Sequence, residues 1–259
     1  MVNFFKKSLN YWNTAPCNIK YSKKKFLSKE FFLEVNKKKF FVENHIKSFA
    51  EFSKYKNKKV LEIGCGIGTT AMEFIKNKAE YYGVDFSPKS LEIAKLAVKA
   101  FGLERFNPAF IEDDAMYLKK IKKMNIKFDL IYSFGVIHHT LNMQKCFDTI
   151  YDLANKNTEI KIMLYAKNSY KNLISDFRYE AKKNCPIVNL IDENKLNVLI
   201  NKKFEIIDIK QDFIFPYILK FYKKNIYKKI KYFEVMPRKT FNKFRKSLGE
   251  HLLINLKII

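Results

Sequence analysis

Three of the chain's seven glycines stand at alternate positions, as Gly64, Gly66 and Gly68, within residues 60–70. They follow a short apolar run and precede a helical pattern. Glycine lacks a Cβ atom, so its backbone can take a positive φ and a ligand can lie directly against it. An ordinary strand-to-helix turn explains one such glycine but not three. The spacing therefore predicts a ligand-binding turn between a strand and a helix.

A second strand-like segment, residues 81–85, ends in the acidic residue Asp85. In a βαβ nucleotide-binding unit, an acid at the end of the second strand accepts hydrogen bonds from ribose hydroxyls. The glycine spacing differs from the dinucleotide fingerprint G-x-G-x-x-G, and no arginine stands near Asp85 to hold a 2′-phosphate. These observations favour a nucleotide-type ligand that is not a dinucleotide.

The spacing Glu62-x-Gly64-x-Gly66-x-Gly68 resembles motif I of the class I S-adenosylmethionine-dependent methyltransferases. This resemblance implies that the loop passes under the methionine part of the cofactor. It also implies that Glu62 lies near the amino-acid end and that Asp85 holds the ribose. Residues 111–115 resemble the third-strand tip, where an Asp-Ala pair contacts adenine, and residues 128–140 resemble the fourth strand with its outgoing loop. The implied cofactor is S-adenosyl-L-methionine, with S-adenosyl-L-homocysteine as product. The implied cofactor-binding residues are Glu62, Gly64, Cys65, Gly66, Gly68, Asp85, Phe86, Asp114, Ala115 and Ser133.

Strand and helix patterns alternate along the chain, which predicts an α/β fold with a doubly wound, mostly parallel seven-stranded sheet, Rossmann-like as in the methyltransferases. Ser87-Pro88 supplies an N-cap and a first-turn proline for one of the helices. Strands are expected at 59–64, 80–85, 108–112, 128–134, 158–165, 204–210 and 252–259. Helices are expected at 69–77, 88–101, 143–155, 167–183 and 192–201.

Two segments extend this predicted core, which comprises residues 59–212 and 250–259. Residues 1–58 form an N-terminal helical cap, with one or two amphipathic helices between residues 26 and 52. Residues 11–17 are expected to be irregular and contain the only tryptophan, Trp12, as a structural anchor or as a flap over the cofactor. Residues 213–249 are too aromatic for a solvated linker. We therefore expect a helical lid insert before the last strand.

The net charge of +24 raises nucleic acid or an anionic membrane as a partner. However, only Arg105, Arg178, Arg238 and Arg245 among the 50 basic residues are arginines, which specific readers of phosphate and bases favour. Lysines that are spread over the whole chain are typical of a solvated surface, so nucleic acid is possible as a partner but not favoured. No apolar stretch is long enough to span a membrane, and no signal peptide is recognisable, which predicts a cytoplasmic protein.

The four cysteines are scattered without C-x-x-C spacing, so we expect reduced thiols and no metal site. Cys17 and Cys185 adjoin prolines, as the nucleophile of cytosine-C5 methyltransferases commonly does, but neither follows the fourth strand. The segment 133–136 also replaces the Asn/Asp-Pro-Pro-Tyr sequence that enzymes acting on adenine-N6 or protein glutamine often carry. These classes of acceptor are therefore disfavoured.

His138 and His139 follow the fourth predicted strand, where ligands of doubly wound sheets bind, and histidine titrates near neutral pH. Either is a candidate catalytic base, with His139 preferred because it lies farther into the loop; the alternative is that one histidine only packs. Trp12, Tyr165, Tyr217 and Tyr222 are candidate substrate contacts, although such aromatics are often core residues.

The sequence predicts a methyltransferase acting at O, N, S or C of a small metabolite or biosynthetic intermediate. RNA methylation is the alternative activity, and a non-catalytic cofactor-binding scaffold is a third reading. The oligomeric state is left open.

Overall fold

The computed structural model describes residues 2–174, 185–222 and 224–259. Its seven-stranded sheet has the order β3-β2-β1-β4-β5-β7-β6, in which β7 is antiparallel to both of its neighbours and the other pairs are parallel. The predicted fold class is confirmed. The strands are β1 (Lys59–Ile63), β2 (Glu80–Asp85), β3 (Ala109–Glu112), β4 (Leu130–Phe134), β5 (Glu159–Tyr165), β6 (Phe204–Asp212) and β7 (His251–Ile258).

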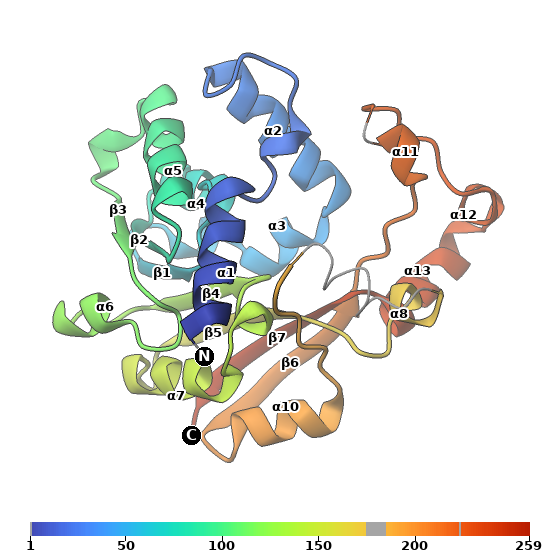
Figure 1. Ribbon diagram of the computed structural model, residues 1–259. Coiled ribbons are helices and arrows are strands. Elements are labelled where there is room, and N and C mark those ends of the chain that lie inside the picture. The colour runs from blue at the N-terminus through green and yellow to red at the C-terminus, as the bar shows by residue number, and fades with distance from the viewer. Residues whose placement is uncertain (1, 175–184, 223) are drawn as a thin grey trace.

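Helices cover both faces of the sheet (Figure 1). The α-helices are α1 (Val2–Thr14), α2 (Lys29–Val42), α3 (His45–Ala50), α4 (Thr69–Lys76), α5 (Pro88–Ala100), α6 (Lys119–Lys123), α7 (Met143–Leu153), α8 (Tyr170–Ile174), α10 (Glu193–Ile200), α11 (Leu219–Tyr222), α12 (Lys231–Val235) and α13 (Arg238–Leu248). The 3-10 turns are η1 (Ile19–Tyr21), η2 (Phe52–Tyr55), η3 (Glu104–Phe106) and η4 (Ile137–His139).

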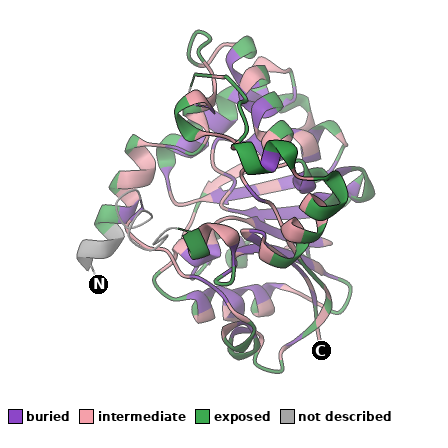
Figure 2. Ribbon diagram, turned by 90° about the vertical axis from the view of Figure 1, so that its right-hand side faces the viewer, coloured by how far each residue is buried: buried purple, intermediate pink, exposed green. Residues whose placement is uncertain are grey.

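The apolar core has two parts, one on each face of the sheet. Helices α2 to α5 contribute to one cluster, whereas α6, α7 and α10 contribute to the other. Figure 2 shows the buried residues along the strands and the exposed residues on the outer surfaces of the helices. This layering leaves the carboxyl ends of the parallel strands free to form a site.

Several helices begin at residues whose side chains cap the N-terminus. The Ser87 hydroxyl accepts a hydrogen bond from the Ser90 amide at 3.1 Å, and Pro88 occupies the first turn of α5, as predicted. Asn142 and Asp192 cap α7 and α10 in the same manner. These side chains satisfy amide groups that a helix leaves without partners in its first turn.

The N-terminal segment differs from the sequence prediction in one respect. The helices expected between residues 26 and 52 are present as α2 and α3, but Tyr11, Trp12 and Thr14 were predicted to be irregular and instead complete α1. The Ala15 amide still donates to the Tyr11 carbonyl at 2.9 Å. Pro16 has no amide hydrogen with which to continue the helix. The helix therefore carries Trp12 on its last turn.

A buried lysine ties the N-terminal helices to the sheet. Lys161, in the middle of β5, is only 1% exposed. Its Nζ atom donates to the Phe49 carbonyl at 3.0 Å and forms an ion pair with Glu51, just after α3. Because a buried ammonium is costly without such partners, these contacts fix the end of α3 against the sheet.

The segment between β5 and β6 and the insert between β6 and β7 complete the chain's path around the sheet. The helix predicted at 167–183 is observed only as α8, because residues 175–184 lie outside the described residues. The insert between β6 and β7 contains α11, α12 and α13, and α13 packs on β6. In Figure 1, α11 and α12 project beyond one end of the sheet. Contacts of Tyr21 with Tyr222 and of Phe41 with Tyr217 place this insert beside the N-terminal helices.

Among the helices that the structure describes, none combines the length and the apolar character needed to cross a membrane.

Candidate active site

The three glycines between β1 and α4 all adopt positive φ values, of 79° at Gly64, 53° at Gly66 and 80° at Gly68. A Cβ atom on Gly64 would lie 2.1 Å from Val136 Cγ2, whereas a Cβ atom on Gly66 would meet nothing within 4 Å. At Gly68 it would lie 3.1 Å from the Cβ atom of Ala94. Gly64 is therefore needed for packing, and the backbone at Gly66 is open to the cavity that it lines.

Asp85 at the end of β2 holds this loop in place. One carboxylate oxygen accepts a hydrogen bond from the Gly66 amide at 2.9 Å, and the other accepts one from the Ser87 amide at 2.9 Å. Burial raises the pKa of Asp85 to about 6, although the amide donors oppose this shift. Each oxygen has a second lone pair, so the ionised carboxylate can still accept hydrogen bonds from a ligand.

Glu62 in β1 is 2% exposed and is held by two hydroxyl groups. Thr70 donates to one carboxylate oxygen and Tyr81 to the other. Burial raises the pKa of Glu62, whereas these hydrogen bonds lower it. The side chain is thus fixed in the wall of the cavity that it lines.

The acids after β3 have different partners. Asp113 accepts hydrogen bonds from the amides of Lys119 and Lys120 at 3.1 and 2.6 Å, and so caps α6, a helix that the sequence analysis missed. Asp114 accepts one from the Met116 amide at 2.8 Å. Burial raises the pKa of Asp114. Asp114 and Ala115 both line the cavity, as Asp85 does.

The two histidines of η4 lie in different environments. His138 is fully buried, and its ring nitrogens have no hydrogen-bond partner among the described residues. Its ring packs on Tyr165, with the centroids 4.0 Å apart. The partly exposed His139 lines the cavity, and its Nδ1 atom lies 2.7 Å from the Ile187 carbonyl oxygen. Burial lowers the pKa of both rings, which favours neutral imidazole.

The contact with Ile187 determines which tautomer His139 adopts. A carbonyl oxygen can only accept, so Nδ1 must carry the hydrogen and donate it. In the neutral ring, Nε2 is then an unprotonated acceptor. His139 can therefore take up a proton at Nε2 without losing its contact with Ile187.

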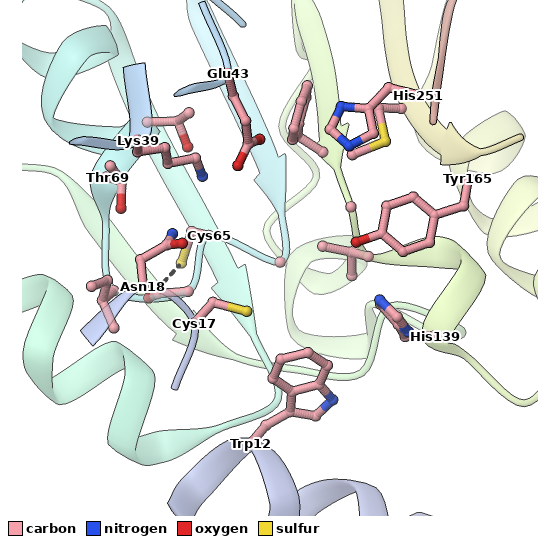
Figure 3. A pocket seen from close by; sticks show the side chains of 18 of the residues that line it. Trp12, Cys17, Asn18, Lys39, Glu43, Cys65, Thr69, His139, Tyr165 and His251 are labelled. Carbon is pink, nitrogen blue, oxygen red and sulfur yellow. Dashed lines mark hydrogen bonds between the residues drawn. The ribbon is translucent and has the colours of Figure 1, made fainter. Parts of the chain in front are cut away.

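All four candidate substrate residues line the same cavity as the glycine loop. They come from separate elements: Trp12 from α1, Tyr165 from β5, and Tyr217 and Tyr222 from the insert or its first helix. Figure 3 shows Trp12, His139 and Tyr165 around one side of the opening. The ring centroids of Trp12 and His139 are 5.6 Å apart. The cavity that these residues share has a volume of about 1220 Å³.

Three residues in the predicted site do not line the cavity. Gly68 packs against Ala94, and the buried Ser133 hydroxyl donates to the Ile63 carbonyl at 3.2 Å. His138 lies behind His139 and Tyr165. The remaining predicted cofactor and substrate residues all contribute to the lining.

Sequence analysis missed several cavity residues, above all Lys39, Glu43, Glu250 and His251. Lys39 in the last turn of α2 and Glu43, the residue that caps its C-terminus, are four residues apart, a spacing typical of an exposed helical ion pair. His251 opens β7, and its Nδ1 atom lies 2.9 Å from Nε2 of the buried His45. No motif marks these residues, because their position depends on how α2 and the insert dock.

Comparison with known families agrees with this geometry. A family model described as a methyltransferase domain matches residues 54–233, which is more than half of the chain. The chain belongs to the class I S-adenosylmethionine-dependent methyltransferases. It is therefore an enzyme whose cofactor is S-adenosyl-L-methionine. No curated protein sequence matches this methyltransferase.

Solved structures share its fold at low sequence identity. Magnesium protoporphyrin IX methyltransferase from Synechocystis PCC 6803, with bound S-adenosylmethionine, is 12% identical with a TM-score of 0.61, over 98% of this chain and 96% of that one. A protein of Pyrococcus horikoshii OT3 is 13% identical with a TM-score of 0.58, over 96% and 99%. A structure described as converting a disulfide bond into a thioacetal group during echinomycin biosynthesis is 16% identical with a TM-score of 0.55, over 82% and 80%.

Proposed function

We propose that this methyltransferase methylates a small metabolite or biosynthetic intermediate inside the aromatic cavity. The observation that carries the proposal is that Trp12, Tyr165, Tyr217 and Tyr222 converge with His139 on the cavity that Gly66 also lines. Aromatic walls with a few polar groups are typical of small-molecule sites. The magnesium protoporphyrin and echinomycin proteins, which share the fold, also have small-molecule chemistry in their descriptions.

The residues at the glycine loop fit the family's cofactor. The open backbone at Gly66 offers a surface for the methionine part, and the free lone pairs of Asp85 can accept the ribose hydroxyls. Asp114 and Ala115 are assigned to the adenine. Glu62 and Lys39 both line the cavity, and their charges suit the ammonium and carboxylate of the amino-acid part. When bound, the cofactor supplies an electrophilic methyl group on a sulfonium.

His139 is assigned as the general base. Its Nε2 atom is the free acceptor of the ring, and the Ile187 carbonyl stabilises the protonated ring that forms when Nε2 takes a proton from the acceptor. His138 is assigned a packing role beneath Tyr165. Methyl transfer is an in-line displacement, so alignment of the acceptor by the aromatic walls supplies much of the rate.

Residues 1–58 and 213–249 are assigned as the cap and lid that complete the cavity. Lys38 of α2 donates through Nζ to Asn225 Oδ1 at 2.5 Å, which links the two segments. The lid excludes water from the reaction and contributes to substrate selection. Free thiols at Cys17, Cys65, Cys146 and Cys185 support a reducing compartment such as the cytoplasm.

RNA methylation is the second candidate, favoured by the net charge of +24. The two candidates are separated by incubating the protein with S-adenosylmethionine labelled in its methyl group. One sample contains a filtered metabolite extract and the other contains total RNA. We expect label in a small molecule, with no steep salt dependence between about 50 and 200 mM. Label in RNA that persists at the higher salt would overturn the proposal, and absence of any transfer would favour a scaffold.

A further inference from the structure

Glu43 places a carboxylate in the cavity that forms no hydrogen bond or ion pair among the described residues. The carboxylates of Glu62, Asp85 and Glu250, which also line the cavity, each have hydrogen-bond or ion-pair partners. Glu62 is held by two hydroxyls, Asp85 by two amides, and Glu250 forms an ion pair with Lys171 at 3.2 Å. A carboxylate removed from bulk water needs hydrogen-bond donors or a partner of opposite charge. Glu43 therefore lacks a partner that the other acids have.

The surroundings of Glu43 make it part of the substrate space. Figure 3 shows its carboxylate pointing into the cavity, with Lys39 on the side of Thr69 and with Tyr165 and His251 on the other. Burial raises the pKa of Glu43, and the charge of Lys39 opposes this shift without forming an ion pair. Burial and then the charge of Glu43 raise the pKa of Tyr165. This coupling places the Glu43 charge beside a candidate substrate residue.

The aromatic wall next to Glu43 already accommodates an ammonium group. Lys38 Nζ lies 4.5 Å from the ring centroid of Tyr222 and 5.2 Å from that of Tyr21. Burial and then the charge of Glu43 raise the pKa of Tyr21 to about 12, and Tyr21 lines the same cavity as the carboxylate. Aromatic faces and a carboxylate together bind organic cations, through cation–π attraction and charge-assisted hydrogen bonds.

We infer that Glu43 recognises the ammonium group of the substrate, and that the substrate is a small organic amine with an apolar body. This inference rests on the proposed small-molecule function and makes it more specific. The ammonium group would donate to the Glu43 carboxylate while the apolar body packs against Trp12, Tyr165 and the lid aromatics. An amine would give Glu43 the partner that it lacks, while the neighbouring Lys39 remains available for the carboxylate of the cofactor, to which it is assigned.

The test is a binding comparison on the protein loaded with S-adenosylhomocysteine. Benzylamine, 2-phenylethylamine and 3-phenylpropylamine are each compared with the alcohol of the same length. Trp12 is the only tryptophan and lines the cavity, so its fluorescence reports binding there, and calorimetry gives the affinity. The variant is Glu43→Gln, which keeps the shape and removes the charge. The matched control is Glu30→Gln, which removes an exposed carboxylate from the first turn of α2, the helix that Glu43 caps, and lies outside the cavity.

We expect at least one amine to bind about tenfold to a hundredfold more tightly than its alcohol in the native protein and in Glu30→Gln. Glu43→Gln should lose this preference while keeping its affinity for S-adenosylhomocysteine, which shows that the cavity is folded. If no amine is preferred over its alcohol, or if Glu43→Gln keeps the preference, the inference is wrong. Failure of the native protein to bind S-adenosylhomocysteine would instead contradict the proposed function itself.

Discussion

The two central glycines of the loop should respond very differently to the same substitution. Alanine at Gly64 would need a positive φ and would place its Cβ atom within 2.1, 2.6 and 2.8 Å of three carbons of Val136. Because all of these atoms belong to one branched side chain, rotation of that side chain cannot clear the space. Alanine at Gly66 needs the same kind of backbone conformation but meets no atom within 4 Å.

These contacts set the expected loss of stability. The positive φ costs about 1–2 kcal/mol at either position. Overpacking against Val136 adds about 1–3 kcal/mol at Gly64. Gly64→Ala should therefore lower the free energy of unfolding by about 2–5 kcal/mol, and Gly66→Ala by only about 1–2 kcal/mol. Gly66→Ala should instead weaken S-adenosylhomocysteine binding, since its methyl group occupies the space assigned to the cofactor.

Urea unfolding measures the stability of both variants, and calorimetry measures their affinity for S-adenosylhomocysteine. Val136→Ala in the Gly64→Ala background should recover part of the lost stability, because it removes the overlapping carbons. The same second substitution should give no recovery with Gly66→Ala. Equal destabilisation by the two single substitutions, or failure of Val136→Ala to discriminate between them, would refute this account of the loop.

Three further predictions concern the cofactor, the base and the lid. If the carboxylate form of Asp85 accepts the ribose hydroxyls, as we propose, burial that raises its pKa to about 6 should make S-adenosylhomocysteine affinity fall about tenfold for each pH unit well below that value. Asp85→Asn should bind about 1–3 kcal/mol more weakly in calorimetry, without this pH dependence. His139→Asn should lower turnover of the acceptor found in the labelling experiment by about 10²–10⁴ and leave S-adenosylhomocysteine affinity unchanged; loss of both would indicate a structural role. Replacing residues 213–249 by a short glycine-containing turn should preserve S-adenosylhomocysteine binding but abolish or broaden methyl transfer, and unchanged selectivity would exclude a lid role.

The parts of the site that were predictable depend on contacts that are local in sequence. Gly66 and Asp85 belong to one βαβ unit, in which strand pairing brings the loop and the second strand end together. The backbone explains both residue types. A positive φ favours glycine at position 66, and loop amides without backbone partners favour an acid at position 85. Such constraints leave a recognisable spacing. The fold class followed from the same alternation of strands and helices.

The residues that were missed depend on long-range docking. Glu43 reaches the cavity only because α2 packs beside the insert, and its spacing from Lys39 resembles an ordinary surface ion pair. Ser133 shows how a family pattern can differ from the position of a side chain. It follows the family pattern in sequence, but in the structure its side chain donates to the Ile63 carbonyl, while the adjacent Phe134 lines the cavity. A one-residue shift along a strand moves a side chain to the other face of the sheet.

The electrostatics of the cavity also differ from those of the whole chain. A net charge of +24 alone favours polyanions as partners. Yet acids outnumber lysines in the cavity lining, and two of the lysines, Lys38 and Lys171, are held by Asn225 and by Glu250. The acids are Glu43, Glu62, Asp85, Asp113, Asp114 and Glu250, and the lysines are Lys20, Lys38, Lys39 and Lys171. A buried charge acts strongly on a ligand that is shielded from water, whereas surface lysines are screened by salt beyond about 8–10 Å. If Glu43 recognises the substrate as we infer, the substrate class depends on this carboxylate inside the cavity and not on the lysines of the surface.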